Sequence, residues 1–469
     1  MKATERWDVF ELTLTGPAAE NPYRDVEFAA DFRHGHRVVP VAGFYDGDGT
    51  YTVRFMPDRQ GPWTYTTRST EPELDGVDGE FVCVPPGPGN HGPVRVAGPR
   101  TFAYADGAPH HPFGTTCYHW THYEDDKLEE RTLRTLAQSP FNKVRMCLLP
   151  TRAMTPPRLP YPGIGERPPA PRELDTTRFD PEFFRRFERR VRDLRDLGIE
   201  ADIILFHPYD AGHWGVDDMS REDDLALVRY AVARLASLRN VWWSIANEYD
   251  FNQAKTVDDW HHIGRQVQHA DPYQHMRSIH NGTRMYEYER IFDFRAPWTT
   301  HQSIQHWDAA LAPEWLDRVP KPVVIDEIGY EGILGRRWGN LTGQALLRQF
   351  WHGMAAGAYV GHGECYPEQD PDATAWVSRG GTLHGEVTPR IAFLRTLWEQ
   401  SPDAVFTYFG DRRHRHREVT LPEAGGPWHL DLIDTWNMTL APLPGPPRTG
   451  RVRIPLDHRP DMALRMRKA

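Results

Sequence analysis

Between about residue 95 and residue 402 the sequence alternates short apolar runs with amphipathic helical stretches, and this alternation constrains the fold most strongly. The eight short runs that we interpret as strands are 113–117, 143–148, 201–206, 241–245, 277–280, 298–301, 322–326 and 358–360. Strands that alternate with helices predict a parallel sheet, because each connection must return over the sheet. Eight such units over roughly 300 residues predict an α/β protein with a (β/α)8 TIM barrel.

Two of the intervening helices have clear start signals. One is expected after Asp180, because Pro181 suits the first helical position and Gly198 ends the apolar stripe. Another is expected after Ser220, with Asp223 three residues further on as a capping-box partner. Further helices are expected at 260–270, 313–318, 344–356 and 389–399.

The two ends of the chain show the pattern of antiparallel strands instead. Alternating runs before residue 85, separated by turn residues, predict an immunoglobulin-like β-sandwich. These runs are 9–15, 25–32, 37–41, 51–55 and 63–67, and a Pro- and Gly-rich linker follows at 85–90. The runs 404–409, 428–433 and 450–454 predict a small C-terminal β-domain. The predicted domains are therefore 1–85, 86–402 and 403–469.

Composition limits the partners and the location. Lys+Arg 55 against Asp+Glu 65 gives a net charge of −10, so a nucleic acid is not expected as a partner. The sequence has no apolar run of eighteen residues and no signal-peptide core at its start, so we expect a cytoplasmic protein without a membrane contact. The cysteines are widely spaced and predict buried, reduced thiols. They are Cys83, Cys117, Cys147 and Cys365.

Two glutamates follow the fourth and seventh predicted strands. The run 241–245 leads into Asn247 and Glu248, and the run 322–326 is followed directly by Glu327. The carboxyl ends of barrel strands meet over one pocket, so these side chains are expected to face each other across it. Cleavage of a glycosidic bond requires two carboxyl groups flanking the bond, and we interpret Glu248 and Glu327 as such a catalytic pair.

Each glutamate has an alternative. Taken alone, Glu248 could equally be an ion-paired carboxylate at a strand end, and the matching position of Glu327 favours catalysis. Near the seventh strand, Asp326 and Glu331 are rivals of Glu327. Asp326 alternates to the opposite side of the strand, and Glu331 lies beyond a glycine, so Glu327 is preferred.

Other polar and aromatic side chains near strand ends are candidates for binding a sugar, with plain packing as the alternative for each. Those proposed from their position are Asn247, His119, Trp120, His280, Glu364 and Trp376. The proline-rich insertion 149–177 follows the second strand and either walls the pocket or decorates the surface.

Several other chemistries lack their basic parts. No H-E-x-x-H or comparable ligand spacing occurs among the histidines, so neither a metal nor another cofactor is expected. The G-x-S-x-G, Walker and dinucleotide motifs are also missing from the sequence. Serine hydrolases, nucleotide triphosphatases and dehydrogenases are therefore disfavoured.

The paired glutamates resemble the clan of retaining glycoside hydrolases built on (β/α)8 barrels, with Asn247-Glu248 after strand four and Glu327 after strand seven. The resemblance implies that Glu248 is the general acid/base and Glu327 the nucleophile. A retaining enzyme is expected to hold these carboxyl groups about 5–5.5 Å apart. The resemblance also implies subsite roles for several residues, although Arg145 could instead orient a carboxylate. These residues are Arg145 after strand two, His207 after strand three, and His301 or Gln302 near strand six.

Three further motifs resemble a bacterial family with an apiosidase-like catalytic barrel. They are 43–47 (G-F-Y-D-G) with 53–55 (V-R-F) after it, 380–386 (G-G-T-L-H-G-E) and 434–438 (D-T-W-N-M). In that family a β-sandwich and a C-terminal β-domain flank the barrel. We therefore expect a retaining, exo-acting glycoside hydrolase with a carbohydrate substrate, and the missing signal peptide favours small oligosaccharides or glycosides. The alternative function is a catalytically inactive carbohydrate-binding or scaffolding protein on the same barrel. The oligomeric state is open, and a homo-oligomer is one alternative.

Overall fold

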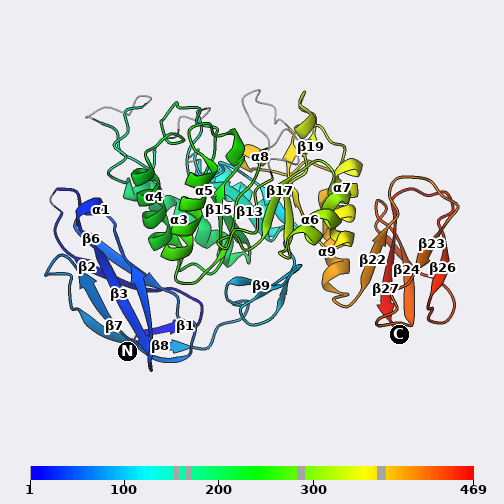
Figure 1. Cartoon of the computed structure of the whole chain (residues 1–469), viewed down its shortest axis with the longest axis horizontal. Coiled ribbons are helices and arrows are strands. Elements are labelled where there is room, and N and C mark those ends of the chain that lie inside the picture. Colours follow the sequence, from blue (N-terminus) through cyan, green and yellow to red (C-terminus); the bar gives the residue numbers. More distant parts are fainter. Residues whose placement is uncertain are drawn as a thin grey trace.

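The computed structural model describes residues 2–18, 20–123, 125–152, 156, 158–164, 172–282, 291–366 and 376–469. A central barrel lies between two β-sheet domains, one formed by each end of the chain (Figure 1). The predicted fold class is therefore confirmed.

The barrel is an eight-stranded parallel sheet with the order β16-β15-β14-β13-β12-β20-β18-β17. Its strands are β12 (Gly114–Thr116), β13 (Lys143–Cys147), β14 (Glu200–Phe206), β15 (Val241–Ala246), β16 (Met276–Ser278), β17 (Gln302–Gln305), β18 (Val323–Glu327) and β20 (Tyr359–His362). Between β16 and β17 a parallel bridge joins His280 to Ser303, and the Thr300 amide donates to the Arg277 carbonyl over 2.8 Å. These contacts bring the barrel close to closure.

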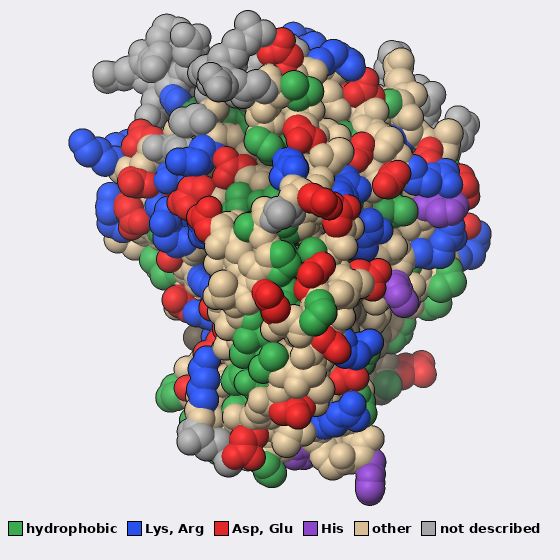
Figure 2. Space-filling model, turned by 90° about the vertical axis from the view of Figure 1, so that its left-hand side faces the viewer, with side chains coloured by type: hydrophobic (Ala, Val, Ile, Leu, Met, Phe, Trp, Pro, Cys, Tyr) green, Lys and Arg blue, Asp and Glu red, His purple; other side chains and the backbone are tan. Residues whose placement is uncertain are grey.

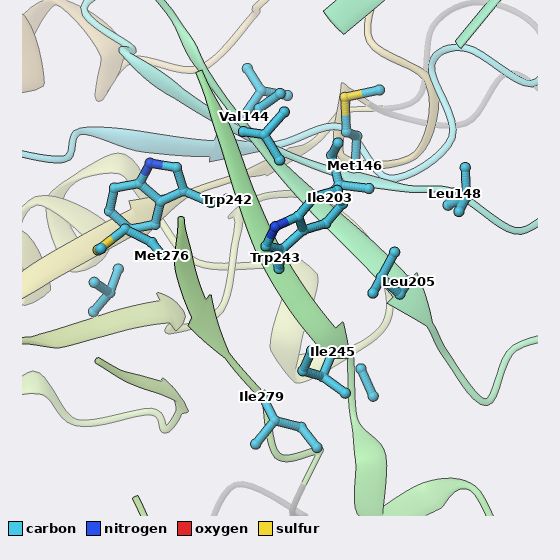
Figure 3. Packing of buried hydrophobic residues seen from close by; sticks show 14 of the residues in the cluster. Val144, Met146, Leu148, Ile203, Leu205, Trp242, Trp243, Ile245, Met276 and Ile279 are labelled. Carbon is cyan, nitrogen blue, oxygen red and sulfur yellow. The ribbon is translucent and has the colours of Figure 1, made fainter. Parts of the chain in front are cut away.

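Every residue of β13, β14 and β15 is buried, as expected for parallel strands covered on both faces. Figure 3 shows apolar side chains of these strands, among them Ile203, Trp243 and Ile245, close to one another in the core. Continuous burial explains the apolar runs of β14 and β15, from which these strands could be recognised.

Helices surround the barrel and begin where their caps predict. Asp180 accepts hydrogen bonds from the first-turn amides of α3, and Ser220 accepts one from the Asp223 amide. The helices are α2 (Asp126–Ala137), α3 (Pro181–Asp196), α4 (Arg221–Leu235), α5 (Val257–Ala270), α6 (Ala312–Arg318), α7 (Gly343–Ala356), α8 (Trp376–Arg379) and α9 (Thr388–Glu399). The sequence did not predict α2, because its buried face carries Glu129, which pairs with Arg186 (2.6 Å) and Arg190 (2.5 Å).

The N-terminal domain consists of two sheets, as predicted, and a short helix α1 (Pro22–Asp25). One sheet has the order β1 (Lys2–Glu5), β8 (Asp78–Val84), β7 (Gly61–Ser69), β3 (Phe28–His34) and β4 (Arg37–Ala42). The other has the order β2 (Phe10–Thr15), β6 (Thr50–Phe55) and β5 (Phe44–Tyr45). Stacked rings fill the core, with Phe32 and Phe55 4.2 Å apart between centroids. Acidic and basic side chains are interspersed on the face that carries this domain (Figure 2).

A three-stranded antiparallel sheet closes the lower end of the barrel (Figure 1). Its strands are β9 (Val94–Gly98), β10 (Thr101–Tyr104) and β11 (Pro109–His110). The ring of Phe102 lies 5.2 Å from Trp242, 5.8 Å from His301 and 5.5 Å from Tyr359. Trp242 and Tyr359 lie at the starts of β15 and β20, and His301 directly precedes β17, so the sheet plugs the N-terminal end of the barrel.

The C-terminal domain also forms two sheets, of which the sequence predicted only part. They contain β22 (Val405–Tyr408), β27 (Met462–Lys468), β24 (Trp428–Asp434) and β25 (Thr439–Pro442), and β23 (His416–Thr420) with β26 (Arg451–Pro455). The ring of Phe406 stacks on Trp398 of α9 at 3.9 Å, and Asp461 pairs with Arg348 of α7 at 2.8 Å. A last pair, β19 (Glu331–Gly332) and β21 (Glu364–Cys365), lies above the barrel. In the described part of the chain we find no helix with the length and apolar character needed to cross a bilayer.

Candidate active site

A cavity of about 680 Å³ lies over the C-terminal ends of the barrel strands. Glu248 and Glu327 both line it, from β15 and β18 on opposite sides of the barrel. Aromatic side chains make up much of the remaining wall, together with Gln305 at the end of β17. The other lining residues are Tyr118, His119, Thr151, Arg152, Pro208, Tyr209, Ala211, Phe251, Gly282, Tyr330, Trp338, Val377 and Ser378.

The insertion 149–177 reaches this cavity through Thr151 and Arg152. That part of the insertion walls the pocket, which is one of the two alternatives that the sequence left open. Its residues 153–155, 157 and 165–171 lie outside the described part of the chain.

Glu248 has an unusual backbone. Its φ of 46° and ψ of 49° place it in the left-handed region, which is strained for a residue with a side chain and recurs at functional sites. Gly282 packs against it so closely that a Cβ there would lie 2.5 Å from the Glu248 Cβ. The strand end, the turn and this glycine therefore aim the carboxyl group into the cavity.

Burial raises the pKa of Glu248 to about 8, and the negative charge of Glu327 adds to the shift. Hydrogen bonds from the Tyr209 hydroxyl and the Gln305 amide act in the opposite direction and hold the carboxyl group in place. Glu248 is therefore a carboxylic acid at neutral pH, with a proton to give.

Glu327 is buried, with 5% of its surface exposed, and its Oε2 accepts a hydrogen bond from the Tyr118 hydroxyl over 3.0 Å. Burial alone would raise its pKa, but the neighbouring His280, Arg145 and Tyr118 lower it below the ordinary value. Glu327 is therefore ionised at neutral pH. The two carboxyl groups thus supply one proton donor and one anion to the same cavity.

Asn247 and Arg145 lie behind the cavity rather than in its wall. Arg145 donates from Nη2 to Asn247 Oδ1 over 2.7 Å, and the Asn247 amide donates to the hydroxyls of Tyr209 and Tyr118. Both residues are at most 1% exposed. The structure therefore places them where they support groups that line the cavity.

Asp326, the alternative to Glu327, points into the barrel interior. There Lys143 lies 2.7 Å from Asp326 and 2.6 Å from Asp202, and Ser303 donates to the second Asp326 oxygen. The other alternative, Glu331, accepts backbone hydrogen bonds from Glu386 and Val387.

The two histidines expected near the first and third strands are placed differently. His119 lines the cavity. His207 lies below it, where Nε2 contacts the Leu149 carbonyl at 2.9 Å and the ring stacks on Tyr209 at 5.1 Å. His280 is fully buried, with Nδ1 3.2 Å from Ser303 Oγ and Nε2 3.8 Å from Glu327.

The expectation for His301 and Gln302 was wrong. The sequence ended strand six at His301, whereas β17 begins at Gln302, so both lie at the lower end of the barrel. Gln302 donates to the backbone carbonyls of α6 and the segment after it, and the His301 ring packs on Trp242. The strand end carries Gln305 instead, which the sequence missed because the run Q-S-I-Q has little apolar character.

Three more candidates are not among the residues that line the cavity. Trp120 is fully buried in the core. Trp376 donates from Nε1 to Thr115 Oγ1 over 2.9 Å. Glu364 accepts from the amides of His384 and Gly385 over 2.6 and 2.8 Å, and so anchors the 380–386 motif to the barrel.

One group among the described residues could hold a metal ion. The ligand atoms of His119, Cys147 and His207, all buried, lie within 4.8 Å of one another. Both ring nitrogens of His207 already have partners, the Leu149 carbonyl and the Tyr209 amide, so a metal would have to displace one of them. His207 therefore supports the backbone at Tyr209 in this structure.

Family models match the chain in three segments. Residues 97–366 match the family described as apiosidase-like, catalytic domain. Residues 3–70 and 397–467 match two domains of unknown function, DUF5060 and DUF5605. No curated protein matches the chain.

Solved structures share the fold. A candidate glycoside hydrolase from Bacteroides vulgatus ATCC 8482 is 36% identical, with 100% of both chains covered and a TM-score of 0.92. A glycoside hydrolase family 5 protein from the same organism is 13% identical, covering 81% of this chain and 94% of its own, with a TM-score of 0.60. Another glycoside hydrolase is 14% identical, with 81% of this chain and 98% of its own chain covered and a TM-score of 0.64.

The catalytic-domain match spans more than half of the chain, and the 36% identical relative spans all of it. The motifs in the sequence pointed to the same family. The chain belongs to the apiosidase-like family and is a glycoside hydrolase with a carbohydrate substrate.

Proposed function

We propose that this glycoside hydrolase acts with retention of configuration, with Glu248 as the general acid/base and Glu327 as the nucleophile. The observation that carries the proposal is the opposite shift of two carboxyl pKa values over one cavity. Cleavage of a glycosidic bond needs a protonated acid and an ionised carboxylate at the same time, and the two environments provide them. Retention is what the resemblance of the paired glutamates to the retaining clan implies.

In the first step the Glu248 carboxylic acid protonates the glycosidic oxygen while the Glu327 carboxylate attacks the anomeric carbon. The bond to the leaving oxygen breaks, the alcohol departs, and an ester joins the sugar to Glu327. Ester formation removes the negative charge that helps to raise the pKa of Glu248, so that pKa falls. Glu248 is then a carboxylate that can act as a base.

In the second step Glu248 takes a proton from water while the water oxygen attacks the anomeric carbon. The ester bond breaks, Glu327 leaves as a carboxylate, and Glu248 is again protonated. Two inversions at the same carbon give overall retention.

We propose exo action on small oligosaccharides or glycosides. A cavity of about 680 Å³ has the size of sites that bind a small molecule. His119 and Gln305, which line the cavity, are the side chains that we propose to bind sugar hydroxyls. The supporting residues Asn247, Arg145 and His207 act through their neighbours.

We also propose domain limits at 1–85, 86–402 and 403–469. The first limit falls between β8 and β9, and the second falls between α9 and β22. In this division the sheet that plugs the barrel belongs to the catalytic domain.

A panel of nitrophenyl glycosides tests the function. It should include pyranosides and furanosides of both anomers, and compare the wild type with Glu248→Gln and Glu327→Gln. We expect turnover of at least one substrate by the wild type and its loss in both variants, and proton NMR should show the retained anomer as the first product. Inversion would contradict the retaining mechanism. Equal behaviour of all three proteins would favour an inactive carbohydrate-binding protein.

A further inference from the structure

Tyr118 lines the same cavity as Glu327 and reaches its carboxylate from β12, which is separated from β18 by β20 alone. It follows β12, the first barrel strand, and its hydroxyl donates to Glu327 Oε2 over 3.0 Å. Its backbone is held on both sides, because its amide donates to the Val377 carbonyl over 2.8 Å and its carbonyl accepts from the Cys147 amide over 2.7 Å. These two hydrogen bonds fix the backbone of Tyr118, so its side chain can hold the Glu327 carboxylate in one position.

The donor and the acceptor in each hydrogen bond of the Tyr118 hydroxyl follow from its three partners. The Asn247 amide nitrogen, 3.4 Å away, can only donate, so the Tyr118 oxygen accepts from it. An ionised Glu327 can only accept, so the single Tyr118 proton goes to Oε2. The Tyr330 hydroxyl, at 3.2 Å, is then left to donate to Tyr118. Two donors thus polarise the Tyr118 hydroxyl toward the carboxylate.

Asn247 also connects the two carboxyl groups. Its amide donates to the hydroxyl of Tyr209, which bonds Glu248, and to that of Tyr118, which bonds Glu327. Gln305, at the end of strand six, bonds Glu248. Glu327 accepts its hydroxyl hydrogen bond from Tyr118, which follows the first barrel strand.

The two oxygens of Glu327 differ in their surroundings. Oε2 accepts from Tyr118 and is the oxygen nearest to His280, at 3.8 Å. Oε1 has no hydrogen-bond partner within the described ranges. We propose that Tyr118 is a positioning residue that fixes Oε2 of Glu327 and leaves Oε1 as the oxygen that attacks the anomeric carbon. This inference rests on the proposed function, in which Glu327 is the nucleophile.

Substitution Tyr118→Phe tests the inference, because it removes the hydroxyl and keeps the ring. A hydrogen bond to a charged group is lost, so kcat should fall by about 10- to 100-fold with little change in KM. The Tyr118 hydroxyl stabilises the ionised form of Glu327, so its removal should raise the pKa of Glu327. The acid limb of the profile of kcat/KM against pH should move to higher pH.

Tyr161→Phe is the matched control. Tyr161 is a buried tyrosine outside the cavity wall, and its hydroxyl has no hydrogen-bond partner in the described part of the chain. The control should keep the wild-type acid limb. If Tyr118→Phe does not fold, Tyr330→Phe serves instead, with a smaller shift of the acid limb in the same direction.

An unchanged acid limb and kcat in a folded Tyr118→Phe protein would overturn the inference. The same holds for an unchanged limb in Tyr330→Phe where that variant is used. Failure of the proposed function gives a different result, because Glu327→Gln would then retain turnover. Loss of activity in Glu327→Gln with a wild-type profile in Tyr118→Phe would contradict only the role of Tyr118.

Discussion

The two ends of the barrel treat the same kind of residue in opposite ways, and the glutamines of β17 show the difference. Gln302, at the start of the strand, donates to the carbonyls of Trp315, Val319 and Lys321. Gln305, at the end of the strand, lines the cavity, and its Oε1 has no hydrogen-bond partner within the described ranges. Three positions along one strand separate a side chain committed to the fold from one left open to a ligand.

The same contrast holds for the backbone and the charges. The lower end is plugged by the β9–β11 sheet, with Phe102 among three rings. The upper end holds Glu248 in a left-handed conformation and two carboxyl groups with shifted pKa values. Strain and unmatched polar groups reduce stability, so a fold tolerates them where they serve function. Substitutions at the upper end should therefore change activity, and those at the lower end should change stability.

The largest effect is expected for Glu327→Gln. Loss of a nucleophile costs on the order of 10⁴–10⁶-fold in kcat, as the amide cannot attack the anomeric carbon. Circular dichroism should show an unchanged fold. Turnover near the wild-type rate would contradict the role of this end of the barrel.

Phe102→Ala at the lower end should show the reverse. Removing a buried phenylalanine from among three rings costs about 3–5 kcal/mol of unfolding free energy. Urea denaturation measures the loss, and kcat below the transition should equal that of the wild type. A large fall in kcat without a loss of stability would break the contrast between the two ends.

Parallel substitutions of the glutamines sharpen the comparison. Gln302→Leu leaves backbone carbonyls without a donor and should cost about 1–3 kcal/mol of stability with no change in kcat. Gln305→Leu removes a bond to Glu248 and should lower kcat about tenfold while stability stays nearly constant. Measurements of kcat and of urea denaturation on both variants check these expectations. A fall in kcat for Gln302→Leu together with a loss of stability for Gln305→Leu would contradict the roles given to the two ends of the barrel.

The smallest effect concerns pH. The pKa of Glu248 is raised to about 8, so wild-type stability should decline as the pH rises from the ordinary carboxyl range through about 8. Glu248→Gln removes this buried charge, and above pH 8 it should melt about 2–4 °C higher than the wild type. Thermal melts at pH 5 and pH 9 measure the difference. A variant that melts lower than the wild type at pH 9 would contradict the raised pKa.

The positions of the two glutamates could be predicted because their strands are strong signals. β15 and β18 are buried throughout, so their apolar runs define where each strand ends. The end of a strand in a parallel barrel defines the position of a side chain at the pocket. Glu248 and Glu327 follow from that rule alone.

Weak strands explain what the sequence did not reveal. β17 reads Q-S-I-Q, and its polar side chains have hydrogen-bond partners inside the barrel and at its lower end. Because this run has little apolar character, the sixth strand was predicted at 298–301, which lies before the observed strand. Helix α2 was missed because Glu129 is buried through ion pairs with α3. The roles of Tyr209 and Tyr118 depend on contacts between distant loops, which no local pattern encodes.

Azide rescue of Glu248→Ala and Glu327→Ala, with NMR of the products, tests the assignment of the two carboxyl groups most directly. Without Glu248 the nucleophile remains, so azide should replace water in the second step and give a glycosyl azide of retained configuration. Without Glu327 azide should attack the substrate directly and give the inverted configuration. The exchanged outcome, or full turnover of both variants without azide, would contradict the assignment.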